Sequence, residues 1–187
     1  MKLASLLLAA LLLASGCSTQ VIQPSYYLLR PGEDSGSRAL EPASDFALGN
    51  VIISSYIDQP GLLLETESGE MRPARHHLWA EPMYEGVRNY LLLEISRARG
   101  RDIIPAKFNK EAALVDIRVD QFHGTFDGRA KLVAFWWLRH GDEVFASYKY
   151  SEERTLAEDG YAALAAAEKA LLTDLAEQIA GSLVAKD

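Results

Sequence analysis

KLVAFWWLRHGDEVFASYKY, residues 131–150, contains two runs rich in β-branched and aromatic residues, with a short polar break between them. Such runs fit the half-buried surface of a β-sheet. The break is His140-Gly141-Asp142, and its glycine tolerates the backbone angles that a tight turn requires. Residues 131–139 and 143–150 are therefore predicted to form an antiparallel hairpin, with the rest of a sheet around it.

A strand with one solvent-exposed face is predicted just before this hairpin. Residues 113–122 alternate, with Val115, Ile117 and Val119 on one side and charged residues on the other. A period of two is typical of a strand that has one face on the core. Further short runs have strand composition; they are residues 25–29, 46–57, 62–66, 71–78 and 102–106.

Two segments instead have a period close to four, which is typical of helices. The first lies between Pro82 and Gly100, because proline suits the start of a helix and glycine its end. The second is the alanine-rich segment 161–183. The apolar stripes are Met83, Val87, Leu91 and Ile95 in the first helix, and Leu164, Leu171, Leu175 and Ile179 in the second. Together these elements predict an α+β fold: a single domain, residues 25–187, with a mainly antiparallel β-sheet and two helices packed against it.

The N-terminus has the layout of a secretory signal peptide. Lys2 precedes an apolar run over residues 3–14, and small residues then lead to Cys17, the only cysteine. The run is too short to span a bilayer as a helix. Residues 13–17, LASGC, resemble the bacterial lipobox, in which the cysteine is lipidated and becomes the first mature residue.

We therefore expect a cleaved lipoprotein signal peptide at residues 1–16 and a lipidated tether at residues 17–24. Cys17 would become an N-acyl, S-diacylglycerol cysteine that holds palmitate-type chains in the membrane. The alternative is an ordinary secretory signal cut near Gly16, which leaves a free thiol. By resemblance to sorting signals, Ser18 rather than aspartate after the cysteine favours the outer membrane, with the folded part facing the periplasm.

Composition and motifs exclude several classes of function. The net charge of −7 argues against nucleic acid as a partner. The four histidines lack metal-ligand spacing, and Asp116, Arg118 and Asp120 on one strand face fit a solvated row of charges better than a catalytic pair. Nucleotide-binding, zinc and serine-hydrolase motifs are absent from the sequence. We therefore expect no enzyme, no metal site and no cofactor.

The aromatic residues of the hairpin are candidates for a partner-contact or lipid-contact surface. Phe135, Trp136 and Trp137 are consecutive on one predicted strand, so Trp136 faces away from its two neighbours. If the helices cover one face, the other exposes at least one large aromatic ring, and exposed apolar patches often mark interaction sites. The alternative is a sheet that is buried on both faces, or a tryptophan that is only partly covered.

Several segments, in this order, carry a resemblance to one family; they are residues 26–29, 51–60, 79–82, 122–136 and 161–180. The chain resembles the PqiC/YmbA-like auxiliary lipoproteins of ABC-type and MCE intermembrane transport systems. The resemblance implies a non-enzymatic, lipid-anchored component that docks a lipid transporter at the outer membrane. Its implied partners are an MCE-domain protein and an inner-membrane permease, and some members form homo-oligomeric rings. The alternative is a lipid-binding or structural envelope lipoprotein without a dedicated transporter.

Overall fold

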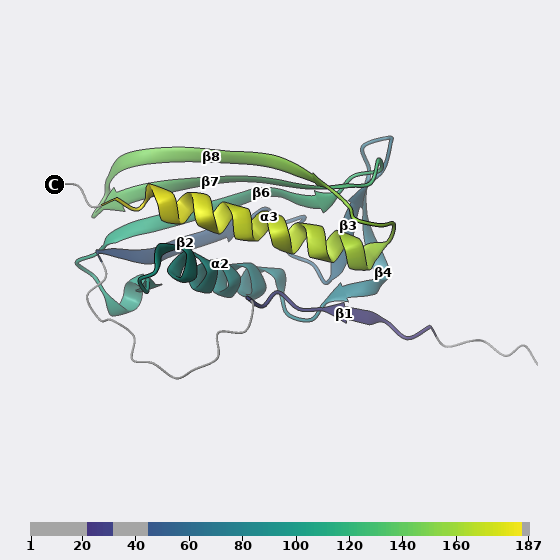
Figure 1. Cartoon of the computed structure of the whole chain (residues 1–187), viewed down its shortest axis with the longest axis horizontal. Helices are drawn as coiled ribbons and strands as arrows, with labels where there is room; N and C mark the ends of the chain where they lie inside the picture. Colours follow the sequence, from purple (N-terminus) through teal and green to yellow (C-terminus); the bar gives the residue numbers. More distant parts are fainter. Residues whose placement is uncertain (1–21, 32–44, 185–187) are drawn as a thin grey trace, which may run out of the picture.

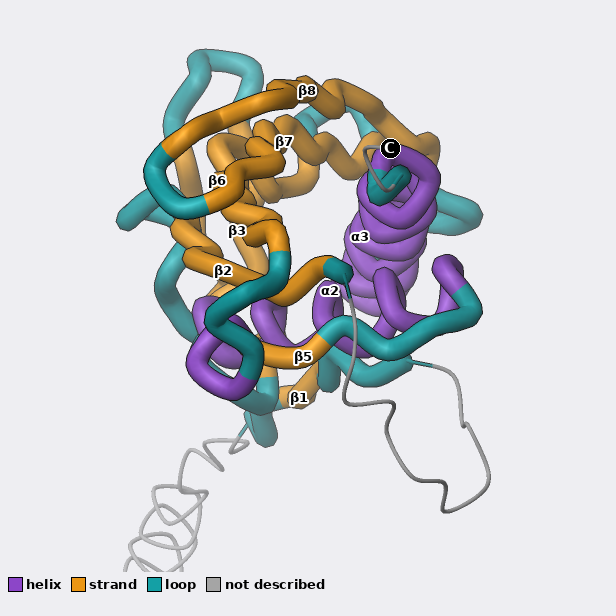
Figure 2. Tube along the Cα trace, turned by 90° about the vertical axis from the view of Figure 1, so that its left-hand side faces the viewer, coloured by secondary structure: helices purple, strands orange, loops and turns teal. Residues whose placement is uncertain are grey.

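The structure, a computed structural model, describes residues 22–31 and 45–184. In this part of the chain, one sheet forms a layer and two α-helices, α2 (Met83–Arg99) and α3 (Tyr161–Ser182), form a second layer against one of its faces. Figures 1 and 2 show both helices on the same side of the sheet. The predicted α+β fold with a single domain is confirmed.

The sheet is built on a meander of the three longest strands. β6 (Ala113–Gly124), β7 (Arg129–His140) and β8 (Glu143–Thr155) follow one another in antiparallel pairs. The other edge of β6 pairs with β2 (Phe46–Ile53) along its first half and reaches β3 (Gly61–Glu65) at its end. The sheet then continues from β3 to β4 (Met71–Trp79) and β1 (Ser25–Tyr27), while β5 (Ile104–Pro105) extends it beyond β2.

The prediction of a mainly antiparallel sheet is confirmed by the long pairings, but the sheet also contains parallel pairs. β2 runs parallel to β6, and β1 runs parallel to β4. Composition marks a segment as a strand without saying which strand lies beside it, so these neighbours could not be predicted. The predicted strand 46–57 was also too long, because a turn begins at Ser54, where the Ile57 amide bonds to the Ser54 carbonyl at 2.9 Å.

Both helices occur where the apolar period predicts them. α2 follows Pro82, and it ends at Gly100, whose φ of 68° is the left-handed conformation that glycine adopts without strain. The stripe residues of both helices are buried. Tyr90 of α2 joins the helices by a hydrogen bond between its hydroxyl and that of Thr173 in α3, at 2.7 Å.

The core lies between the sheet and the two helices. The inward residues of β6, which are Val115, Ile117 and Val119, are at most 1% exposed, as their alternation predicts. A few polar residues are buried with this core, and Glu168 of α3 is the most deeply buried of them among the described residues: it is only 1% exposed, and its Oε2 atom has no hydrogen-bond partner. Burial raises the pKa of the Glu168 carboxyl well above its ordinary value, which favours the protonated form.

Candidate functional site

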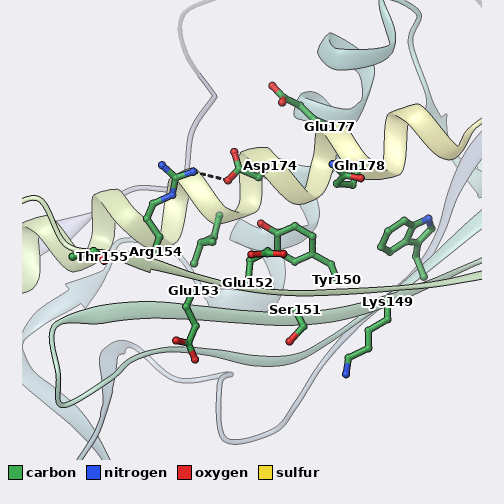
Figure 3. Close-up of a pocket in the computed structure, with 12 residues that line it drawn as sticks. Lys149, Tyr150, Ser151, Glu152, Glu153, Arg154, Thr155, Asp174, Glu177 and Gln178 are labelled. Carbon is green, nitrogen blue, oxygen red and sulfur yellow. Dashed lines mark hydrogen bonds and ion pairs between the residues drawn. The ribbon is translucent and has the colours of Figure 1, made fainter.

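A groove of about 750 Å³ lies between β8 and α3 and is the candidate site of this fold. Figure 3 shows Tyr150 and Arg154 directed from β8 toward the helix, and Asp174 facing them from α3. Glu177 also lines the groove, but its side chain points to the other side of α3, where its carboxylate lies 3.7 Å from the guanidinium of Arg97 in α2. Lys149 and Glu153 point away from the helix in the same view. The groove is thus lined by residues 149–155 of β8, of which alternate side chains face the helix, and by one side of α3.

The alternation of β8 and the position of α3 create this groove. In β8, every second residue faces the helices, and its inward residues pair with inward residues of β7, as Tyr148 does with Trp136. The two rings stack with centroids 4.9 Å apart. Trp136 is 4% exposed and Tyr148 is 38% exposed, so the helix covers β7 well and β8 only in part.

The groove has a net acidic character. Asp174, Glu177 and Glu152 line it together with one inward cation, Arg154. The Arg154 guanidinium donates to Asp174 Oδ2 at 2.6 Å, which neutralises part of this charge and ties β8 to α3. Burial, followed by the charges of Asp174 and Glu152, raises the pKa of Tyr150 to about 12, so this hydroxyl stays protonated at physiological pH.

Toward the end of α3 the groove continues as a more apolar hollow of about 850 Å³. Phe145 and Tyr148 line it from β8, and Gly181 and Val184 line it from the end of α3 and beyond. Val184 is 71% exposed. The groove and the hollow that continues it therefore form one surface along β8, with an acidic end and an apolar, aromatic end.

The three predicted contact residues do not lie on one surface. As the alternation predicts, Trp136 faces opposite to Phe135 and Trp137. Trp136 packs in the core and donates from Nε1 to Ser182 Oγ at 3.0 Å, so it reaches a surface only as part of the groove floor. Phe135 and Trp137 are half-buried on the face away from the helices, where their rings stack 6.4 Å apart. Because the helices cover its face, Trp136 itself is not an exposed contact residue.

The other predicted positions have structural contacts or lie outside the described residues. Asp116 accepts from the Asn50 amide at 2.7 Å and from Arg139 Nε at 2.6 Å, so it bridges a β2 irregularity to β7. His77 stacks on Tyr161 at 4.5 Å. Cys17, with the predicted signal peptide and most of the tether, lies outside the described residues.

The described residues contain neither a metal-binding cluster nor a membrane-spanning helix. Within residues 22–31 and 45–184, no group of three or more His, Cys, Asp or Glu side chains is placed to hold a metal ion. Over the same residues, no helix has the length and apolar character needed to cross a bilayer.

Sequence reasoning did not identify the acidic wall of the groove. Glu152 and Arg154 lie in β8, beyond the end of the strand that the sequence predicted, whereas Asp174 and Glu177 belong to a helix about twenty residues later. Only packing brings them together. The signal available in the sequence was the charged run SEER, residues 151–154, at the end of an otherwise apolar strand.

Fold and site together define a class: a small α+β domain with an open sheet edge and a groove beside its last helix. The chain belongs to a family within that class, because residues 26–180 match the model described as the ABC-type transport auxiliary lipoprotein component. This assigns it, at the level of the family, to the auxiliary lipoproteins of ABC-type transport rather than to an enzyme family.

Curated relatives agree with this assignment. The chain is 27% identical over 157 residues to the intermembrane transport lipoprotein PqiC of Escherichia coli (strain K12), and the match covers 82% of each protein. PqiC of Shigella flexneri matches with the same identity and coverage. The predicted family resemblance is therefore confirmed.

Solved structures share the fold. One, of an uncharacterized protein, has a TM-score of 0.73 at 20% identity and covers 87% of this chain and 99% of its own. Another, from Xanthomonas campestris, has a TM-score of 0.63 at 19% identity and covers 73% of this chain and 81% of its own. At these identities the likeness supports the architecture alone.

Proposed function

We propose that this protein is the lipid-anchored docking component of an intermembrane lipid transport system of the MCE/ABC type. The observation that carries the proposal is the family match, which begins at Tyr26, only a short distance after Cys17. A lipid on Cys17 holds the chain on the outer membrane. The folded domain then faces the periplasm within a few residues of the bilayer.

In this role the domain binds other proteins and leaves transport energy to its partners. An MCE-domain protein and an inner-membrane permease are the partners that the family resemblance implies. The open groove offers a binding surface, and its acidic lining suits protein side chains better than acyl chains. A homo-oligomeric ring of anchored domains would present several such surfaces around the end of a tube.

The groove also bears on the alternative that the domain itself carries a lipid. An acyl chain requires a dry, apolar cavity. The acidic end of the groove contains Glu152, Arg154, Asp174 and Glu177, and it is open to solvent. These charges favour docking over lipid carriage by this groove.

Crosslinking in intact envelopes tests the proposal. Full-length tagged protein, purified after mild crosslinking, should recover an MCE-domain protein that mass spectrometry identifies. The same tag on an unrelated outer-membrane lipoprotein is the control for nonspecific capture. Recovery of no MCE-domain protein, with the anchored chain itself well recovered, would contradict the proposal and favour a structural envelope role.

A further inference from the structure

β8 is a free edge of the sheet in the part of the chain that the structure describes. It pairs with β7 along its whole length and with no other described strand. Pairing from Ala146 to Thr155 proceeds without a register shift. Alternate backbone amides and carbonyls of such an edge point outward, where they can bond to an added strand.

The side chains on β8 determine which strand can be added. Folded proteins often protect an exposed edge with charges that point inward, because these repel a generic apolar strand. Glu152 and Arg154 occupy inward positions of this kind, and Arg154 is already paired with Asp174. Glu152 is left exposed beside the acidic side of α3. An incoming strand with cationic side chains would compensate this charge, and one with anionic side chains would be repelled.

An added strand would lie alongside the groove. Neighbouring strands are about 4.8 Å apart, so every second side chain of the newcomer would stand beside the exposed wall of α3. Along that wall, Asp174 faces the part of β8 that contains Arg154, and Val184 with Gly181 line the part that contains Tyr148. Glu177 lies at the outer rim of the wall, where it also pairs with Arg97 of α2. The groove thus matches an extended segment with basic residues toward one end and apolar residues toward the other.

We propose that β8 is a strand-addition site for an extended, basic segment of a protein partner, with that segment's inward side chains seated in the groove between β8 and α3. This inference rests on the proposed docking function and specifies its surface and the chemistry of its partner. Main-chain hydrogen bonds to the edge supply part of the binding, and the acidic wall supplies selectivity.

Peptide binding to the purified lipidated chain in detergent micelles tests the proposal. The probes are three fluorescent ten-residue peptides: one alternates threonine and lysine, one alternates threonine and glutamate, and one is the threonine–lysine peptide with every backbone amide N-methylated. The threonine–lysine peptide should bind saturably, and the other two should not. The N-methylated peptide keeps the charge but has no backbone N–H group to donate to the edge. Equal binding of the N-methylated peptide, or no saturable binding of the threonine–lysine peptide, would overturn the proposal.

Matched charge variants locate the binding. Glu152→Gln combined with Glu177→Gln should weaken binding of the threonine–lysine peptide about tenfold, since two of the carboxylates that line the groove lose their charge. Glu67→Gln combined with Glu158→Gln removes the same charge from exposed turns, and it should leave the affinity unchanged. An equal loss in both double variants would show a general charge attraction and contradict the site.

The same variants separate this inference from the proposed function. In the envelope experiment, the groove variant should recover less MCE-domain protein than the turn variant. Equal recovery by both would overturn the strand-addition site and leave the docking function standing. If two differently tagged copies of this chain copurify, and the groove variant alone abolishes this, the edge is an interface between copies and the proposal is wrong.

Discussion

At the scale of single residues, Glu168 is the clearest conflict between side chain and surroundings. It lies in the apolar layer between α3 and the sheet, and burial is the one cause that shifts its pKa upward. In the unfolded chain the carboxyl ionises near its ordinary pKa of about 4.5. Folding must therefore keep the group protonated at neutral pH, and this costs stability.

Replacing Glu168 should accordingly stabilise the protein in a pH-dependent way. The contribution of Glu168 to stability is complete below pH 4.5 and is lost as the pH rises toward the folded-state pKa. Glu168→Gln should therefore raise the free energy of unfolding at pH 7. In the wild type this free energy should fall with pH by up to about 1.4 kcal/mol per pH unit because of Glu168, and the variant should lack this fall. Denaturant unfolding between pH 4 and pH 8 measures this effect.

Glu177→Gln is the matched control for this prediction. Glu177 lies on the same helix but is exposed, so this substitution should change the free energy of unfolding at pH 7 far less than Glu168→Gln does. If Glu168→Gln leaves the pH dependence of the free energy of unfolding as it is in the wild type, the Glu168 carboxyl does not cause that dependence.

At the scale of elements, the packing of the two helices and of the first hairpin depends on a few specific contacts. The hydroxyls of Tyr90 and Thr173 join α2 to α3 at 2.7 Å. In the β3–β4 hairpin, a Cβ atom added at Gly61 would lie 2.5 Å from the carbonyl oxygen of Ala74. The hydrogen bond holds the two helices together, and the lack of space at Gly61 shows how closely β3 and β4 approach each other.

A double-mutant cycle measures the helix-to-helix contact. Tyr90→Phe and Thr173→Val each remove one hydroxyl, and each should lower the free energy of unfolding by about 1 kcal/mol. Because both act on the same hydrogen bond, the double variant should lose about 1 kcal/mol less than the two losses added together. Strictly additive losses in denaturant unfolding would show that the hydroxyls do not interact in solution.

Gly61→Ala tests the close approach of the strands. The added methyl group meets backbone atoms that cannot move aside cheaply, so the expected loss of stability is about 1–3 kcal/mol. Gly181→Ala in α3 is the control, because its Cβ would meet nothing within 4 Å and should stabilise the helix slightly. Thermal melting of both variants decides the comparison, and an unchanged melting temperature for Gly61→Ala would contradict the geometry.

At the scale of the whole molecule, the domain has a core between its two layers and a groove at one edge of its sheet. The predicted anchor precedes this domain in the sequence. On our proposal, anchoring and docking are therefore separate properties of the chain, and a change in one should leave the other intact.

Cys17→Ala tests this separation. Without a thiol to lipidate, the chain should move from the membrane fraction to the soluble periplasmic fraction. Its circular dichroism spectrum and melting temperature should match those of the wild type, and lipid transport should fall. Unchanged membrane fractionation would contradict lipid anchoring at Cys17, whereas a lost melting transition would contradict the separation of anchor and fold.

The sequence by itself determined the elements of this protein and its family. The period of Val115, Ile117 and Val119 identified β6, and Pro82 with Gly100 marked the limits of α2, because backbone preference and apolar period are local properties. Outside the predicted hairpin, the neighbours in the sheet, such as β2 beside β6 and β1 beside β4, were decided only by the tertiary structure. The tertiary structure also decided that Trp136 is buried beneath α3 and that Glu152 and Asp174 line the same groove. Each of these features depends on how segments distant in sequence pack around one core.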